Sequence, residues 1–227
     1  MVKPAGSIAR KTRPRRPARS RRLFSDEAYE RLKEMIITAA LAPGALLTEA
    51  DLAARLGLGR MPVREALQRL AQEDLVIIVP RKGSFVSPIR VEDLQKIFEL
   101  RLSVEGLSAR LAAERIREDE LRFLEALIEK AGDVDEGSRR HVQIDRTFHL
   151  TIAAAARNEY LARAVERTLN LALRLLYLSG SRMSKVAEIA HEYRAVLDAL
   201  RRGDGEAASA AMQAHIEEFR KKVRTSI

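Results

Sequence analysis

The sequence predicts a mainly α-helical protein with two folded parts: three helices and a β-hairpin first, then an all-helical bundle of about six helices. Three observations lead to this fold class. Aromatic residues make up only 4% of the 227 residues, while alanine, leucine, arginine and glutamate dominate, a composition that favours helices over β-sandwiches and barrels. One short segment, residues 75–86, is rich in β-formers. After Pro88 the apolar residues recur at helical spacing only.

The net charge of +9 is carried by one segment of the chain. Residues 1–22 hold nine basic residues and no acidic one, so residues 23–227 hold 32 of each sign. The basic segment has almost no apolar content and is expected to be a disordered tail. It could act as a sequence-independent arm on DNA phosphates or in the minor groove. The alternatives are a solvated extension or a translation start assigned too far upstream. The high net charge therefore does not indicate a basic folded domain.

Several classes of protein are disfavoured by composition. The chain has no cysteine, which excludes disulfides and thiolate metal sites. The most apolar stretch, residues 169–178, is interrupted by Arg174 and is far shorter than the ~20 residues that span a bilayer. No apolar segment follows the basic start as in a secretory signal. We expect a cytoplasmic protein without a membrane partner.

Residues 23–88 are expected to form the first domain. Ser25 is placed to cap a helix that ends before Pro43-Gly44. Thr48 opens a second, short helix with Asp51 in the capping-box position, and Gly57-Leu58-Gly59 ends it. Pro62 then lies in the first turn of a third helix.

A hairpin and six helices complete the expected fold. The run Leu75–Val79, a turn at Pro80–Gly83 and the run Ser84–Ser87 predict the hairpin. Residues 91–227 form the second domain, with breaks at glycine- and asparagine-containing segments. The expected helices lie near 92–114, 118–131, 138–157, 159–180, 182–202 and 204–224.

Three helices followed by a hairpin is the layout of a winged helix-turn-helix, whose third helix enters the major groove of DNA. The expected DNA-binding residues lie at the start of that helix and at the hairpin tip. They are Arg60, Arg64, Gln68, Arg81, Lys82 and Gly83. Arginine can pair with guanine in the major groove, and a basic turn can approach phosphates. The alternative is a solvated face, because residues 23–90 carry nine basic and nine acidic residues. The order of elements favours DNA binding.

Residues 48–90 resemble the DNA-binding domain of the GntR family of bacterial transcription regulators. The match begins T-E-A-D-L-A-A-R-L-G-L-G-R-M-P-V-R-E-A-L and ends R-K-G-S-F-V. The resemblance implies a homodimer on a short palindromic operator, with Arg60 and Arg64 reading bases and Gly83 at the wing tip. Gly59 and Met61 replace the family's usual hydroxyl residues, and Ala50 replaces an arginine found in some members. These departures affect affinity and operator sequence.

Four side chains of the second domain are candidate metal ligands: Asp145, His149, His191 and His215. Asp145 and His149 are four residues apart and share a helical face. A carboxylate and three imidazoles converging in a helical bundle would suit Zn²⁺, Ni²⁺ or Mn²⁺ and leave positions open for an anionic ligand. The alternative is that each histidine is an ordinary core or surface residue, and spacing alone favours that alternative.

Residues 98–113, F-E-L-R-L-S-V-E-G-L-S-A-R-L-A-A, resemble the opening helix of the FCD ligand-binding domain of FadR-like GntR regulators. The family's pattern of metal ligands falls on Asp145, His149, His191 and His215. The resemblance therefore implies a bound divalent metal, zinc first, with nickel and manganese as alternatives. Six helices suggest the shorter, VanR-like variant. His141 is not used by the pattern.

Three further side chains are candidates for binding an effector. Arg101 and Arg174 interrupt apolar helical segments, and a guanidinium that is buried there suits a carboxylate ligand. For Arg101 the alternative is a salt bridge to Glu105, and for Arg174 it is an exposed position. Tyr177 is a weaker candidate.

The resemblances lead to one functional expectation. The chain is a DNA-binding transcription regulator, expected to be a repressor, whose second domain binds a metal and a small carboxylate metabolite that changes operator affinity. The alternatives are a constitutive DNA-binding protein with a structural metal and, less favoured, a metal-dependent hydrolase. No nearby carboxylate is an obvious general base for hydrolysis.

Overall fold

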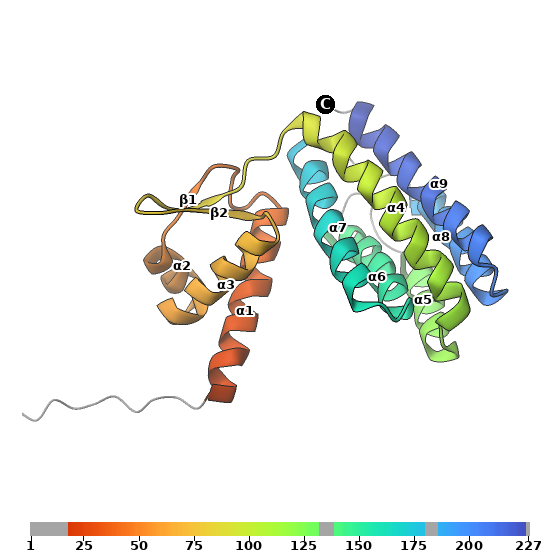
Figure 1. Cartoon of the computed structure of the whole chain (residues 1–227), viewed down its shortest axis with the longest axis horizontal. Helices are drawn as coiled ribbons and strands as arrows, with labels where there is room; N and C mark the ends of the chain where they lie inside the picture. Colours follow the sequence, from red (N-terminus) through yellow and green to blue (C-terminus); the bar gives the residue numbers. More distant parts are fainter. Residues whose placement is uncertain (1–17, 132–138, 180–185, 226–227) are drawn as a thin grey trace, which may run out of the picture.

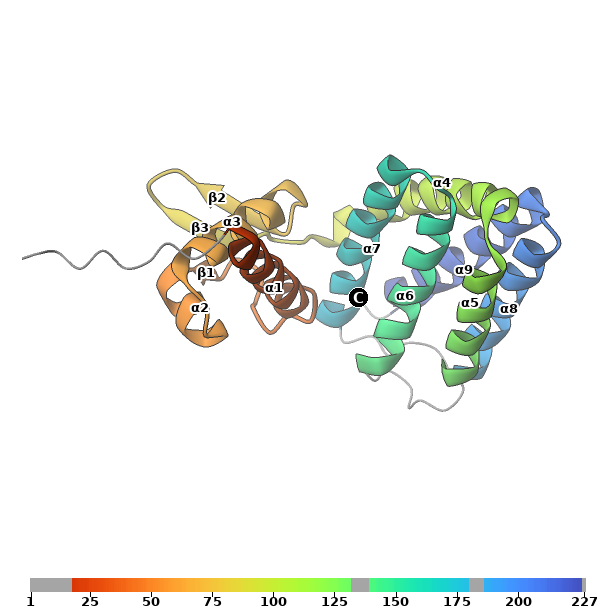
Figure 2. The same cartoon turned by 90° about the horizontal axis from the view of Figure 1, so that it is seen from below.

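The computed structural model describes residues 18–131, 139–179 and 186–225 of the chain. It has two domains, joined by the segment between strand β3 and helix α4, and they lie side by side (Figures 1 and 2). The first contains three helices and a small sheet, and the second is entirely helical in its described part. The predicted fold class is confirmed.

The first domain is built around three helices. These are α1 (Ala18–Ile37), α2 (Glu49–Leu56) and α3 (Arg60–Gln72). Their apolar faces form one core with the small sheet. At its centre Leu32, Val63 and Leu70 are completely buried. This core fixes the orientation of α3, whose opposite face is exposed.

The small sheet has three strands rather than the two of the predicted hairpin. These are β1 (Leu46–Leu47), β2 (Val76–Val79) and β3 (Gly83–Val86), in the order β1-β3-β2 with antiparallel pairing. The register aligns Leu46 with Phe85 and Ile77 with Phe85. β1 was missed because two residues carry no alternation pattern.

Helix α1 begins earlier than the sequence suggested. Residues 18–22 were assigned to the disordered tail, but they form the first turns of α1. These residues contain alanine and arginine, which are good helix formers, and no glycine or proline. Ser25 is therefore a buried residue within the helix and not its cap. The expectation for residues 1–17 lies outside the described residues.

The cap of helix α2 was predicted correctly. The Thr48 hydroxyl oxygen accepts a hydrogen bond from the backbone N–H of Asp51 at 3.2 Å. Gly57 ends the helix in the left-handed conformation, with φ of 68°, which glycine adopts without steric cost. Thr48 thus fixes the start of α2, and Gly57 begins the short turn to the helix expected to read DNA.

The second domain consists of six described helices, as predicted. They are α4 (Val91–Arg115), α5 (Glu118–Ala131), α6 (Arg139–Ala155), α7 (Glu159–Ser179), α8 (Val186–Arg201) and α9 (Gly205–Thr225). The long helix α4 packs against α6, α7 and α9 (Figures 1 and 2). The core contains three fully buried aromatic side chains, Phe98, Phe148 and Tyr193.

Helices α1 and α7 form the contact between the domains. The Lys33 ammonium group on α1 lies 3.0 Å from the Glu166 carboxylate on α7. Arg167 on α7 also pairs with Asp74, which follows α3. Leu171 packs against the cores of both domains. Polar and apolar contacts thus connect the bundle to the three-helix domain.

None of the helices in the described ranges is long and apolar enough to cross a membrane.

Candidate DNA surface and metal centre

The predicted DNA-reading residues lie on the exposed face of α3. Arg60, Arg64 and Gln68 are all exposed and succeed one another at four-residue intervals. Arg64 forms a two-point ion pair with Glu49 of α2, with Nε–Oε1 of 2.6 Å and Nη2–Oε2 of 2.8 Å. This pair fixes the guanidinium plane in the absence of DNA, and Arg64 must leave or share Glu49 to contact a base.

The predicted wing tip is the turn between β2 and β3. Arg81, Lys82 and Gly83 are exposed there. Arg81 has a φ of 63° and Gly83 a φ of 114°, so the turn requires left-handed backbone at two positions. The turn extends beyond the ends of the two strands (Figure 1), and its two cationic side chains are exposed.

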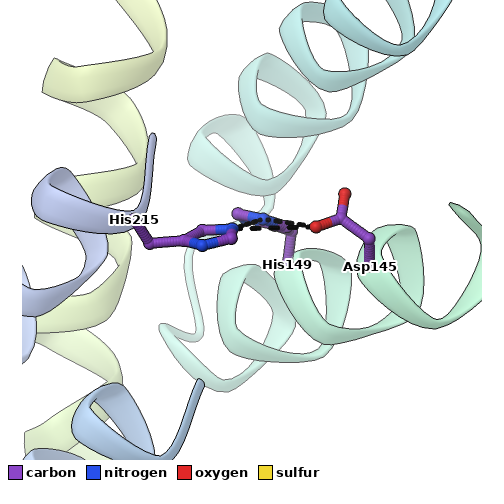
Figure 3. A group of neighbouring side chains, drawn as sticks. All are labelled: Asp145, His149 and His215. Carbon is purple, nitrogen blue, oxygen red and sulfur yellow. Dashed lines mark hydrogen bonds and ion pairs between the residues drawn. The ribbon is translucent and has the colours of Figure 1, made fainter. Parts of the chain in front are cut away.

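Three of the four predicted metal ligands come together in the bundle. Asp145 and His149 project from one face of α6, and His215 reaches them from α9 (Figure 3). The two Nε2 atoms are 3.1 Å apart. Asp145 Oδ1 lies 3.5 Å from Nε2 of His149 and 3.7 Å from Nε2 of His215. All three side chains are buried.

Each histidine of this cluster is held through its other nitrogen by a glutamate. Nδ1 of His149 contacts the Glu105 carboxylate of α4, and Nδ1 of His215 lies 2.6 Å from Oε2 of Glu192 on α8. A carboxylate at Nδ1 places the proton on that nitrogen. Both Nε2 atoms and the anionic Asp145 oxygen then face one another, an arrangement that a metal ion or a shared proton would stabilise.

The charges around His149 determine the protonation of the cluster in the absence of metal. Burial alone would lower the pKa of His149, but Glu105 and Asp145 outweigh it and raise the pKa to about 9. Burial would raise the pKa of Glu105, yet Arg101 and His149 hold it at about 2. The pKa of Asp145 is likewise well below its usual range, because the two histidines outweigh its burial. A proton on His149 supplies the cation when no metal is present.

The donor set and its spacing fit a divalent transition metal. Ligand bonds of about 2.1 Å place two ligand atoms about 3.0 to 3.4 Å apart for angles between 90° and the tetrahedral value. The observed separations of 3.1 to 3.7 Å are close to this range. Carboxylates that hold the outer nitrogens of ligating histidines are also usual at metal sites, because they orient the rings.

The fourth predicted ligand, His191, is not part of the cluster. It is exposed on α8, and the side chain that α8 directs at Asp145 is Tyr193, whose hydroxyl donates to Oδ1 at 2.7 Å. A separation of two residues rotates a helical side chain by about 200°, so His191 and Tyr193 lie on opposite faces. Sequence reasoning missed Tyr193 because it considered only histidine and carboxylate residues.

The candidate effector residues separate into two places. Arg101 is buried and its Nε lies 2.5 Å from Oε1 of Glu105, so the salt bridge considered as its alternative is present beside the histidines. Arg174 is also buried, contrary to its alternative, and donates to the backbone carbonyl of Ser87 in the interdomain segment. Burial lowers the pKa of Arg174 to about 10.

Tyr177 lines a pocket at the junction of the domains. The pocket has a volume of about 260 Å³ and is formed by helices α1, α6 and α7. Its lining combines apolar side chains such as Ile37 and Leu173 with the charged side chains of Lys33 and Arg146. The pocket is therefore placed where a small molecule would touch both domains.

Comparisons with known proteins agree with this architecture. The family model "Bacterial regulatory proteins, gntR family" matches residues 24–86, and the model "FCD domain" matches residues 96–218. The "HTH-type transcriptional repressor RspR" of Escherichia coli is 27% identical over 202 residues, which cover 88% of this chain and 89% of that protein.

Two further comparisons extend over nearly the whole chain. The "Probable D-xylose utilization operon transcriptional repressor" of Paenarthrobacter nicotinovorans is 30% identical over 210 residues, covering 89% of this chain and 91% of the relative. The solved structure of E. coli McbR/YncC superimposes with a TM-score of 0.76 at 25% identity, over 89% of this chain and 97% of that one. The chain thus belongs to the GntR family of bacterial transcription regulators, with an FCD domain following its DNA-binding domain, and is not an enzyme.

Proposed function

We propose that this chain is a dimeric repressor whose operator affinity depends on a metal ion and a small carboxylate metabolite bound in the second domain. The observation that carries the proposal is the convergence of Asp145 Oδ1 with Nε2 of His149 and His215, each histidine being held by a glutamate. Zinc is the first expected metal, and nickel and manganese accept the same donors. The relatives whose names include the word repressor support repression as the direction of regulation.

The DNA-binding half of the proposal rests on exposure and shape. Arg60, Arg64 and Gln68 lie on the free face of α3, and Arg81 and Lys82 extend from the wing. A helix-turn-helix dimer places two such helices on successive half-sites, which favours a palindromic operator. Arginine at the start of α3 would read guanine, while the wing would contact phosphates or the minor groove.

The effector half of the proposal follows from the number of ligands. Three protein ligands leave coordination positions on the metal for small oxygen ligands, and a carboxylate is a suitable one. The metal would supply positive charge that binds and orients this carboxylate, and Arg101 adds a second positive charge beside Glu105. Arg174 and Tyr177 are proposed to act at the domain junction, because Arg174 donates to Ser87 of the interdomain segment and Tyr177 lines the pocket between the domains.

A short chain of ion pairs connects this site to the DNA-binding domain. Arg146 follows the ligand Asp145 on α6, and its Nη2 lies 2.7 Å from Glu166 of α7. The same carboxylate oxygen of Glu166 accepts from Lys33 of α1 at 3.0 Å. A ligand that shifts α6 would change these contacts and so the placement of the DNA-binding domain. It alters operator affinity only if it binds one arrangement better than the other.

The proposal is tested with the full-length protein and a labelled duplex selected from a random pool. Zinc, nickel and manganese affinities are measured by competition with a chromogenic chelator. Operator affinity is then measured by fluorescence anisotropy for metal-free protein, metal-loaded protein, and metal-loaded protein with a panel of small carboxylic acids. A change in operator affinity of fivefold or more with metal or with an acid is expected.

Two results would change the proposal. Equal operator affinity in all three states, despite measurable metal binding, indicates a constitutive DNA-binding protein with a structural metal. No metal binding by the wild-type protein refutes the metal site. His149→Ala, which removes a ligand but leaves α3 unchanged, is the control that connects any metal effect to this cluster.

A further inference from the structure

Tyr193 closes one side of the proposed metal site. Its phenol oxygen lies 2.7 Å from Asp145 Oδ1 and donates a hydrogen bond to it. Its ring stacks on Phe148 with centroids 4.2 Å apart and lies 5.2 Å from the ring of His215. Tyr193 is completely buried. The packing of α8 on α5 and α9, together with its contacts to Phe148 and Asp145 of α6, fixes the position of its hydroxyl.

Helix α8 therefore contributes to the site without contributing a histidine. Glu192 accepts from Nδ1 of His215, and Tyr193 donates to Asp145. His191, the histidine of this helix, is exposed. Position 193 faces Asp145, so a metal-binding side chain at this position of α8 would be placed to reach the site.

We propose that Tyr193 limits the metal to three protein ligands and positions Asp145 as one of them. The inference rests on the proposed metal binding. A phenol that donates its proton to Asp145 Oδ1 uses one lone pair of that oxygen and leaves another for a metal. Two histidines and one carboxylate on one side of a metal leave the remaining positions open, and a small carboxylate or water would occupy them.

The proposal separates two roles of the residue at position 193. As a hydrogen-bond donor, Tyr193 orients the Asp145 carboxylate, and removal of such a partner costs a metal site about 10- to 100-fold in affinity. Because a phenol occupies a position from which an imidazole could coordinate the metal, Tyr193 also leaves the metal without a fourth protein ligand. Tyr193→Phe tests the first role, and Tyr193→His tests the second.

The experiment measures zinc affinity of the full-length protein by chelator competition, together with the visible spectrum of the cobalt(II)-loaded form. We expect Tyr193→Phe to bind zinc about 10-fold or more weakly. Tyr193→His should bind about 10-fold or more tightly than wild type and change the cobalt spectrum. His191→Ala is the matched control on the same helix and should leave both readouts unchanged. Circular dichroism of each metal-free variant verifies folding.

Each other outcome has a defined meaning. The proposal is overturned if His191→Ala weakens binding, or if both Tyr193 variants bind zinc as the wild type does. It is also overturned if iron(III)-loaded wild type shows a phenolate charge-transfer band that Tyr193→Phe lacks, because Tyr193 would then be a ligand itself. If Tyr193→His fails to fold, Tyr193→Phe and the iron spectrum decide. If the wild type binds no metal, the proposed function is refuted. If Tyr193→His then binds zinc although the wild type does not, the inference that Tyr193 limits the number of protein ligands is still supported.

Discussion

Replacing Glu105 by glutamine is expected to destabilise the metal-free protein strongly. The carboxylate is only 1% exposed, and it contacts both Arg101, at 2.5 Å, and His149. Its pKa falls from an ordinary value of 4.5 to about 2, and this difference corresponds to about 3 kcal/mol at about 1.4 kcal/mol per unit. Removing one member of a buried pair costs about 3–5 kcal/mol, since the remaining charge stays buried without compensation.

The measurement is urea unfolding of the metal-free full-length protein, followed by circular dichroism in the presence of a chelator. Glu192→Gln is the matched control, because Glu192 also holds a histidine Nδ1 but its side chain is 20% exposed. We expect Glu105→Gln to lower the free energy of unfolding by about 3 kcal/mol or more and Glu192→Gln by about 1 kcal/mol or less. Both variants should bind zinc about 10- to 100-fold more weakly, because each loses a partner of a ligating histidine.

The pH dependence gives a second test of the same reasoning. The folded-state pKa of Glu105 is depressed, so its contribution is present above its unfolded value of 4.5 and is lost as the pH falls toward 2. The difference in the free energy of unfolding between wild type and Glu105→Gln should therefore decrease as the pH falls from 4.5 toward 2. Equal urea midpoints for the two proteins at pH 7 would refute the argument from the buried pair, and so would an equal loss in Glu192→Gln.

Three further predictions concern DNA binding, coupling and local stability. In anisotropy titrations, Arg64→Ala should weaken binding to a selected operator by about 1–3 kcal/mol and relax the preference for its sequence. Lys82→Ala should instead weaken binding to all DNA sequences alike and reduce the dependence of affinity on salt concentration. The reverse pattern would exchange the roles of the two residues. Glu166→Gln should leave zinc affinity unchanged but reduce the metal-dependent change in operator affinity, because it weakens the contact with Lys33. An undiminished change in operator affinity in this variant would exclude coupling through the ion pairs of Glu166. Thr48→Ala should lower the free energy of unfolding by about 1 kcal/mol through loss of the α2 cap, as measured by urea unfolding, and an unchanged midpoint would show that the cap contributes nothing.

Local signals in the sequence predicted most of the fold. The Thr48 cap, the glycine turn after α2 and the position of Pro62 mark helix ends by backbone chemistry, which acts within a few residues. Apolar spacing likewise predicted all six helices of the second domain. β1 was not predictable in this way, because two residues form a strand only when β3 supplies the hydrogen bonds. The start of α1 differs from the prediction because residues 18–22 share the basic charge of the tail but include good helix formers.

The candidate metal site was predicted in part, for a related reason. The pair Asp145 and His149 follows from helical spacing within α6, but the position of α8 relative to α6 depends on packing between segments distant in sequence. His191 and Tyr193 differ by two residues, and only this packing determines which of them faces Asp145. The roles of Glu105 and Glu192 as partners of the histidines were not predicted either, since each pair joins different helices.

The domain junction depends entirely on such long-range packing, and it is where the proposed function requires the most specific structure. Glu166 joins α6 to α1 because its carboxylate lies between Arg146 and Lys33, and Lys33 is almost completely buried. A buried ammonium group is costly without a counter-charge, and Lys33 also pairs with Glu30 on its own helix at 3.2 Å. Separation of the domains at this point would expose Lys33 and break its pair with Glu166. Glu166 is partly exposed, and it also neutralises the arginine that follows a proposed metal ligand. Under the proposed function, a change at Asp145 would act on the contact between Glu166 and Lys33 through Arg146, without a direct contact between the metal and DNA.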